Sequence, residues 1–186
     1  MSSGLHADAV RVLAEWTAPD AERAALRAEF AALLAERADG VWRTCAPAHI
    51  TASALILDET GSRVLLDLHG RVKLWLQMGG HCEPGDTTVA ATALREATEE
   101  SGVPGLWLLG GPVDLDKHAA PCAPGVVDHH FDLRYVAVAP AGAQPVTSSE
   151  SDDVRWFAVD DLPSATSHDM PRLVAAARDR LPGQPS

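Results

Sequence analysis

The sequence predicts an α/β domain in which helices cover both faces of a mixed sheet, preceded by a helical extension. Apolar residues repeat at helical spacing over roughly the first forty positions, and the pattern then changes to short runs typical of strands. Strand-like and helix-like segments interleave in the rest of the chain. Several strands are joined by short turns, which antiparallel neighbours allow, so a purely parallel sheet is not expected.

The N-terminal segment predicts two amphipathic helices, at about residues 5–16 and 21–38. The second carries an apolar stripe at positions i, i+4, i+7 and i+8, formed by Leu26, Phe30, Leu33 and Leu34. Gly40 then ends it, as glycine commonly does after a helix. We therefore assign residues 1–40 to a helical extension and residues 41–186 to the main domain. The extension either packs on the main domain or serves as a lid or dimer arm, which leaves a homodimer open.

The main domain begins with a predicted hairpin. Residues 49–57 and 63–68 are rich in apolar, strand-forming side chains, and the turn residues 59–61 separate them. Residues 74–76 form a third extended piece, and the glycines and proline of residues 79–86 predict a loop.

The remaining elements are predicted from the same signals. The loop leads into a helix at about residues 88–101, which ends at Gly102. Asp114, Asp116 and Lys117 are typical of a strand end followed by a turn. The other predicted elements are strands near 106–114, 130–138 and 154–157, a polar loop at 148–153, and a last helix at about 169–181.

Charge and composition exclude several classes of protein. The formal net charge of −11 opposes long contact with the phosphate backbone of DNA or RNA. It does not oppose a small polyphosphate, because a bound divalent cation reverses the local field. No apolar run is long enough for a membrane span, and residues 1–10 lack the pattern of a signal peptide. The cysteines fit no zinc pattern, so reduced thiols in a cytoplasmic protein are the simplest interpretation for Cys45, Cys82 and Cys122.

Three carboxylates stand out in the predicted helix. Positions three and four apart share a helical face, so Glu96, Glu99 and Glu100 project together. Like charges on one face weaken a helix unless a cation lies between them. A cluster of hard oxygen ligands suits Mg²⁺, with Mn²⁺ as the alternative, and both ions also bind the phosphate oxygens of a substrate.

Neighbouring residues support this site. Arg95 lies next to the carboxylates in sequence, and its planar guanidinium can hold one of them in a fixed pose. The preceding Gly79 and Gly80 allow the backbone to approach a ligand closely. We expect Gly79, Gly80 and the adjacent His81 to bind substrate.

The segment from Gly80 to Val103 resembles the Nudix box, in which a glycine and a glutamate precede the string R-E-U-x-E-E-x-G-U, where U is aliphatic. The second half of the box is matched by Arg95, Glu96, Ala97, Glu99, Glu100, Gly102 and Val103. Two features depart from it: Asp86 replaces the first glutamate, and one extra residue separates Gly80 from Arg95. The preceding W-L-Q-M-G-G-H is also similar to the W-L-Q-P-G-G-H of Nudix domains.

The resemblance covers about residues 47–162 and implies the Nudix α/β/α sandwich. It further implies a divalent metal and hydrolysis of a nucleoside diphosphate linked to another group, X. Carried over by position, Glu96, Glu99 and Glu100 are metal ligands, and Arg95 orients one of them. The acidic stretch 149–153 lies where similar proteins often carry an extra acid on a mobile loop. The candidates for the general base are Glu96, Glu99, Glu150, Asp152 and Asp153. The group X stays open.

Two alternatives remain. The same fold hosts isoprenoid-diphosphate isomerases, which need a catalytic Cys and Glu in their own motif. Cys82 lies next to the glycine loop, but no Cys–His relay in the sequence marks it as a nucleophile. The other alternative is a catalytically silent nucleotide-binding module, against which the intact glutamate cluster argues.

Histidines and tryptophans are further candidates for substrate contact. His129 and His130 begin an alternating strand, so their side chains face opposite ways and only one can enter a given site. His49 and His81 are comparable candidates, and His81 is the better placed. The tryptophans that either stack a base or pack in the core are Trp75, Trp107 and Trp156.

Overall fold

The computed structural model describes residues 4–123, 126–147 and 151–181 of the chain. Its helices are α1 (Gly4–Glu15), α2 (Ala21–Glu36), α3 (Val89–Ser101) and α4 (Met170–Arg178). Its strands are β1 (Ala48–Leu57), β2 (Arg63–His69), β3 (Trp75–Leu76), β4 (Met78–His81), β5 (Trp107–Leu108), β6 (Asp114–Ala123), β7 (Val126–Val138) and β8 (Ser151–Ala158).

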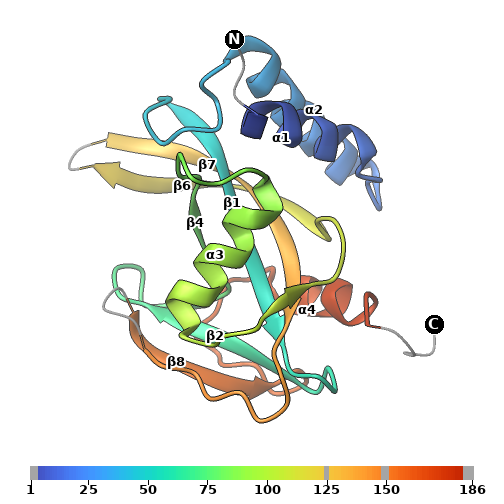
Figure 1. Cartoon of the computed structure of the whole chain (residues 1–186), viewed down its shortest axis with the longest axis vertical. Helices are drawn as coiled ribbons and strands as arrows, with labels where there is room; N and C mark the ends of the chain where they lie inside the picture. Colours follow the sequence, from blue (N-terminus) through green and yellow to red (C-terminus); the bar gives the residue numbers. More distant parts are fainter. Residues whose placement is uncertain (1–3, 124–125, 148–150, 182–186) are drawn as a thin grey trace.

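The strands form one mixed sheet with β1 near its centre (Figure 1). One edge of β1 pairs with β7 in parallel along its whole length. The other edge pairs antiparallel with β4 at residues 51–54 and with β2 at residues 56–57. The predicted hairpin and the mixed sheet are therefore confirmed.

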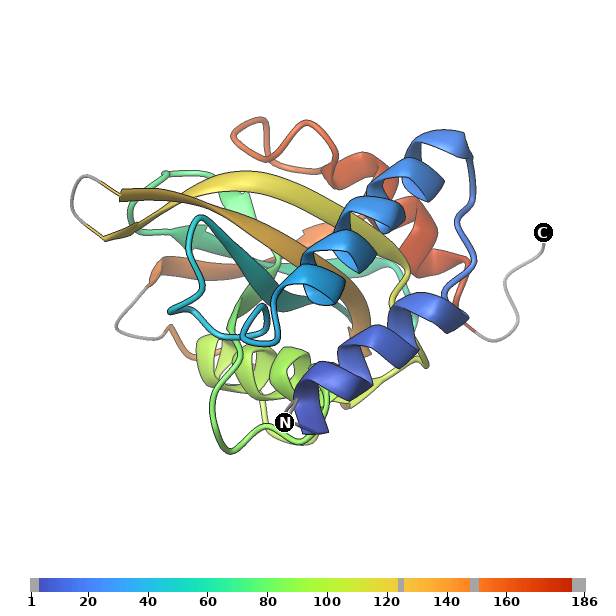
Figure 2. The same ribbon diagram turned by 90° about the horizontal axis from the view of Figure 1, so that it is seen from above.

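Helices cover both faces of this sheet, with α3 on one side and α4 on the other (Figures 1 and 2). Alternate residues of β1 explain this, because successive side chains of a strand point to opposite faces. Ala52 and Ala54 share a buried cluster with Ala93 and Ala97 of α3, whereas Leu55 and Leu57 of β1 share a second cluster with Leu173 and Val174 of α4. The predicted α/β/α sandwich is confirmed.

Local signals set the ends of α3. The side chain of Thr88 caps the first turn by accepting a hydrogen bond from the backbone N of Ala91 at 3.0 Å. Gly102 ends the helix in a left-handed conformation with φ 64°, which glycine adopts without strain. The helix that carries the predicted carboxylates is thus fixed within one residue of its expected limits.

The N-terminal helices pack on the main domain. Leu13 of α1 and Phe30 of α2 are buried in the same cluster as the apolar side chains under α3. The ring of Phe30 lies edge-on to Phe131 of β7, with centroids 4.9 Å apart. Asp8 of α1 also accepts a hydrogen bond from the backbone N of Val89 at the start of α3, at 2.8 Å. The boundary at residue 40 and a role in dimerisation stay predictions.

The predicted strand near residues 106–114 is wrong. Only Trp107 and Leu108 are extended there, as the short β5, and Gly110, with φ 76°, turns the chain away. The chain re-enters the sheet at Asp114 as β6, a strand that the sequence did not predict. Aspartate is depleted in strands, but ion pairs with Arg134 on the neighbouring β7 favour Asp114 and Asp116 here.

The polar segment at 148–153 was also expected to be a loop. Residues 148–150 lie outside the described residues, whereas Ser151 to Asp153 belong to β8 and pair with β2.

No helix in the described part of the chain is both long enough and apolar enough to cross a membrane.

The packing of α2 is testable by truncating its buried anchor. Phe30→Ala is expected to reduce the free energy of unfolding by about 3–5 kcal/mol, because it leaves a cavity against Phe131. Val10, which is 45% exposed on α1, supplies the control, since Val10→Ala should change little. Chemical denaturation measures both variants, and an unchanged midpoint for Phe30→Ala would show that the extension does not share the core.

Candidate active site

The three predicted carboxylates lie on α3 where this helix meets β4. Arg95 Nη1 donates to Glu96 Oε1 and to Glu99 Oε2, each at 3.0 Å, and so holds two of the carboxylates together. Glu100 is held differently, because its Oε2 accepts a hydrogen bond from the backbone N of Gly79 at 2.8 Å. This hydrogen bond connects α3 to β4, the strand that contains Gly79 and Gly80.

Arg95 is itself fixed by Asp86, which stands in place of the first glutamate of the box. Arg95 Nε and Nη2 donate to the two carboxylate oxygens of Asp86 at 3.1 and 3.0 Å, and Nη2 also donates to His81 O at 2.9 Å. Asp86 further accepts from the backbone N of Glu83 and from Thr92 Oγ1. The ionised pair raises the pKa of Arg95; burial opposes ionisation of Asp86, but these hydrogen bonds outweigh it and lower its pKa. Asp86 thus positions Arg95.

Each glycine of β4 makes room for a different neighbour. A Cβ on Gly80 would lie 2.7 to 2.8 Å from the carboxylate atoms of Glu96. A Cβ on Gly79 would point to the other face of the strand and lie 2.3 Å from the Cβ of Ser53 on β1. The sheet backbone therefore requires glycine at Gly79, whereas Gly80 leaves room for a side chain of α3.

The carboxylates suit a divalent cation by their chemistry. Burial, together with the like charges of Glu99 and Glu83, raises the pKa of Glu96 against the opposing effect of Arg95. A cation at this face would relieve that repulsion, and carboxylate oxygens are the ligands that Mg²⁺ and Mn²⁺ prefer. The missing side chain at Gly80 leaves room for the carboxylate of Glu96 beside the strand. Glu96, Glu99 and Glu100 therefore fit such an ion, although their oxygens do not converge within 4.8 Å of one another.

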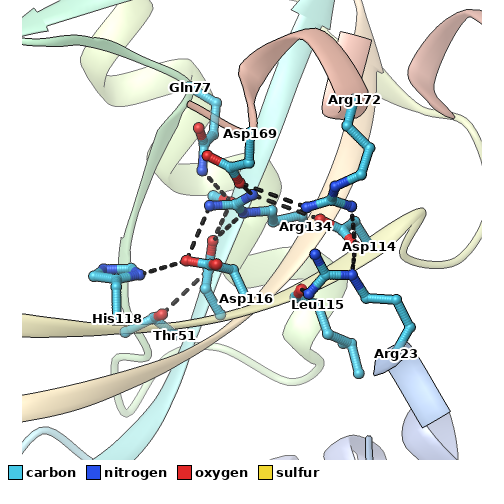
Figure 3. Close-up of polar contacts among 12 residues, drawn as sticks. Arg23, Thr51, Gln77, Asp114, Leu115, Asp116, His118, Arg134, Asp169 and Arg172 are labelled. Atoms are coloured by element: carbon cyan, nitrogen blue, oxygen red, sulfur yellow. Dashed lines mark hydrogen bonds and ion pairs between the residues drawn. The ribbon is translucent and has the colours of Figure 1, made fainter. Parts of the chain in front are cut away.

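The opposite face of the sheet carries a buried network of charges centred on Arg134 (Figure 3). Its guanidinium pairs with Asp116 at 3.0 Å and with Asp169 at the start of α4. Asp114 lies 3.5 Å from Arg134 and also pairs with Arg172 at 2.8 Å. The network extends along β1 and β7, where Asp132 accepts hydrogen bonds from Thr51 and Ser53.

This network was not predicted from the sequence. Asp114 and Asp116 were interpreted as the end of a strand, and Arg134 was given no role. The available signal is the alternation of polar residues, D-x-D-x-H at residues 114–118 and H-x-D-x-R at residues 130–134, which places them on one face of a strand pair.

Three histidines gather beside the network. His49 is fully buried, His81 and His130 are half-buried, and the ring centroids lie 4.8 to 5.1 Å apart. His81 Nε2 is 3.2 Å from His130 Nε2. Burial is the main cause that lowers the pKa of His81 to about 4 and that of His130 to about 3. His129 is exposed, which agrees with the expectation that neighbouring histidines on a strand face opposite ways.

Other candidates lie elsewhere. Burial raises the pKa of the Cys82 thiol to about 11, which suits a packing residue rather than a nucleophile. Asp152 pairs with Lys73 and Asp153 with Arg155, and Glu150 lies outside the described residues. The tryptophans differ in their surroundings. The ring of Trp75 lies edge-on to Phe157, Trp107 is 46% exposed, and Trp156 packs against the core.

An α/β/α sandwich in which the glycines of β4 meet a helix with paired glutamates is the arrangement that the resemblance to Nudix domains implies. The sequence model of the NUDIX domain matches residues 47–177. The chain therefore belongs to the NUDIX family, and it is a Nudix pyrophosphohydrolase. No curated protein matches the sequence.

Solved structures share the fold. A NUDIX-family hydrolase from Clostridium perfringens has 22% identity and a TM-score of 0.55, with 72% of this chain and 95% of that chain covered. An Ap4A hydrolase binary complex from C. elegans has 19% identity and a TM-score of 0.55, covering 73% and 98%. The NUDIX domain of Shewanella oneidensis NrtR, complexed with ADP ribose, has 22% identity and a TM-score of 0.51, covering 71% and 87%. At these identities the likeness concerns the fold.

The two glycines of β4 make a matched pair for mutation. Gly79→Ala should cost about 1–3 kcal/mol of stability or more, because its Cβ meets the Cα of Ser53 at 2.6 Å in a neighbouring strand. Gly80→Ala should cost less than about 1 kcal/mol, since only the flexible carboxylate of Glu96 must move. Thermal unfolding of both variants checks the order; equal losses would contradict it.

The Arg134 network predicts a dependence of stability on pH. Burial disfavours the charge of Asp169, but attraction to Arg134 outweighs it and lowers the pKa from 3.8 to about 2. This contribution, about 2 kcal/mol, is complete above the unfolded pKa and is lost as pH falls from about 4 to about 2.

Asp169→Asn should therefore lower the free energy of unfolding at pH 7, and the difference from the wild type should shrink at pH 3. Urea denaturation at both pH values measures it, with the exposed Asp160→Asn as control. A difference independent of pH would contradict the ion pair as its source.

Proposed function

We propose that the protein hydrolyses the diphosphate linkage of a nucleoside diphosphate joined to another group, with Mg²⁺ or Mn²⁺ as cofactor. The observation that carries the proposal is the helix face of α3. There Arg95 bridges Glu96 and Glu99, while Glu100 binds the backbone of Gly79. Carboxylates in this arrangement suit a cation that also binds the oxygens of a diphosphate.

The similar structures support a substrate class without selecting its members. One is an Ap4A hydrolase and another is a NUDIX domain complexed with ADP ribose. Ap4A and ADP ribose each contain an adenosine whose phosphates are joined to a further group. A small nucleoside diphosphate derivative is therefore the proposed substrate, and long nucleic acids are disfavoured by the net charge of −11.

Each residue has a proposed role. Glu96, Glu99 and Glu100 hold the cation, which when bound neutralises phosphate oxygens and activates water for attack on phosphorus. Arg95 orients Glu96 and Glu99 through its hydrogen bonds. The backbone of β4 from Gly79 to His81 bonds these side chains through Gly79 N and His81 O, and it is the proposed contact for the substrate diphosphate.

The proton of the attacking water needs a carboxylate acceptor. Burial raises the pKa of Glu96, which brings its basicity closer to that required near neutral pH. Glu99, Asp152 and Asp153 remain candidates beside it, and Glu150 is the candidate outside the described residues.

The alternatives differ in what they require of the same site. An isoprenoid-diphosphate isomerase needs a reactive cysteine, and the buried thiol of Cys82 does not supply one. A silent binding module would retain the nucleotide without cleaving it. A cytoplasmic location remains part of the proposal, and the thiol of Cys82, which is in no disulfide, supports it.

The test is turnover with and without the glutamates. Glu99→Gln and Glu100→Gln are expected to reduce kcat roughly 100-fold or more, because each removes a charged ligand while preserving side-chain shape. Phosphate release from nucleoside triphosphates, ADP-ribose, nucleotide sugars and dinucleoside polyphosphates measures the activity, with Mg²⁺ present or removed by chelation.

Glu36→Gln, an exposed change at the end of α2, is the matched control and should leave turnover unchanged. Near wild-type activity in both Glu99→Gln and Glu100→Gln would overturn the assignment of the site. Measurable binding without any hydrolysis in the wild type would favour the binding module.

A further inference from the structure

We propose that His49, His81 and His130 form a second metal site, which binds a transition-metal ion of the Zn²⁺ class through imidazole nitrogens. The site is separate from the carboxylate face of α3 and does not depend on the proposed hydrolysis. Imidazole nitrogens suit Zn²⁺, Co²⁺, Ni²⁺ and Cu²⁺, whereas carboxylates suit Mg²⁺ and Mn²⁺. The two sites would therefore select different ions.

The distances between the rings match such an ion. One ligand nitrogen from each histidine lies within 4.8 Å of the other two, a convergence found for no other triad of His, Cys, Asp or Glu in the described parts of the chain. His81 Nε2 and His130 Nε2 are 3.2 Å apart. Two nitrogens at about 2.0–2.1 Å from a tetrahedral Zn²⁺ are separated by roughly 3.3–3.4 Å. An ion can thus replace the contact between these two rings with little movement of either.

Strand register explains why the three rings converge. The parallel pairing of β1 and β7 places His49 opposite His130. The antiparallel pairing of β1 and β4 places Thr51 opposite His81, and residues 49 and 51 of β1 point to the same face. The donors come from three strands far apart in sequence, so the backbone holds them in position before any ion binds.

His49 is oriented by a hydrogen bond to the backbone. Its Nδ1 lies 3.1 Å from Cys45 O, and because a carbonyl only accepts, Nδ1 must be the protonated nitrogen. The lone pair is then on Nε2. Histidines that bind metals commonly donate their other nitrogen to a carbonyl or carboxylate in this manner. The bond thus fixes the ring of a fully buried histidine in an orientation compatible with metal binding through Nε2.

The surroundings leave access for an ion. His81 and His130 are half-buried, and the exposed His118 of β6 lies beside His130 with ring centroids 5.3 Å apart. Nδ1 of His118 forms a hydrogen bond with Asp116 at 2.7 Å, so the histidine next to the triad is itself bonded to a carboxylate. Three protein ligands leave a fourth coordination position for water or another small ligand.

A bound ion would cross-link β4 to β1 and β7 through one histidine from each strand. Along β4, Gly80 faces Glu96 and the next residue, His81, faces the other side of the strand. A metal bound at the triad would thus fix the end of the same strand whose glycines meet the glutamates.

Cobalt titration tests the proposal. Chelator-treated protein is titrated with Co²⁺ in excess Mg²⁺, so that Mg²⁺ competes for the carboxylates. One equivalent should bind with the intense visible absorption of four- or five-coordinate Co²⁺, and Zn²⁺ should displace it. His81→Gln and His130→Gln should each weaken binding at least about 10-fold.

Two controls distinguish the sites. His129→Gln changes the neighbouring, exposed histidine on the same strand and should bind Co²⁺ as the wild type does. Glu99→Gln should also leave the spectrum unchanged. Absence of binding in the wild type, weak octahedral absorption that disappears with Glu99→Gln, or full binding by both triad variants would overturn the proposal.

A measurement on the wild type covers the case in which the variants do not fold. Zn²⁺ added to ¹⁵N-labelled protein in excess Mg²⁺ should shift the ring nitrogens of three histidines, with those of His129 unchanged. Unshifted resonances for His49, His81 and His130 would reject the site, whatever the outcome of the proposed hydrolysis assay.

Discussion

Strand β1 pairs with β7 along one edge and with β4 and β2 along the other, and this register determines what each face of the sheet carries. On the face toward α3, every residue from Ile50 to Ile56 that points there is apolar. On the opposite face the strand is polar from His49 to Ser53 and apolar at Leu55 and Leu57, where α4 covers it. A slip of one residue would exchange these faces, so the register is strongly specified.

The carboxylate face depends on this sheet through β4. Glutamates on neighbouring turns repel one another, and burial of Glu96 adds to the cost of its charge. Arg95 offsets the repulsion by bonding two of them, but it does so only because Asp86 and His81 O hold its guanidinium in place. Strand β4, whose glycines were wrongly predicted to lie in a loop, forms one unit with the helix and the arginine, and Asp86 holds that arginine in place.

Local signals predicted the parts of the molecule that depend on short stretches of sequence. The limits of α3 and the shared face of its glutamates lie within about twenty residues, as does the β1–β2 hairpin. Strand β6 was missed because its first residues have low strand propensity, and they are stabilised by Arg134 about twenty residues later. The histidine triad was missed as well, because it too depends on residues far apart in the sequence. His49, His81 and His130 were considered one by one, and only the pairing of three strands brings them together.

Strand β4 lies between the carboxylate site and the histidine site, because three consecutive residues of this strand contact different side chains. Gly79 donates its N–H to Glu100 and lies against Ser53, Gly80 admits the carboxylate of Glu96, and His81 turns its ring to His49 and His130. The oxygen donors and the nitrogen donors therefore lie on opposite sides of a single extended strand. A displacement of this strand would break the hydrogen bond from Gly79 N to Glu100 and move His81 away from His49 and His130. The pairing of β4 with β1 is thus as important to the chemistry of the site as the identity of its side chains.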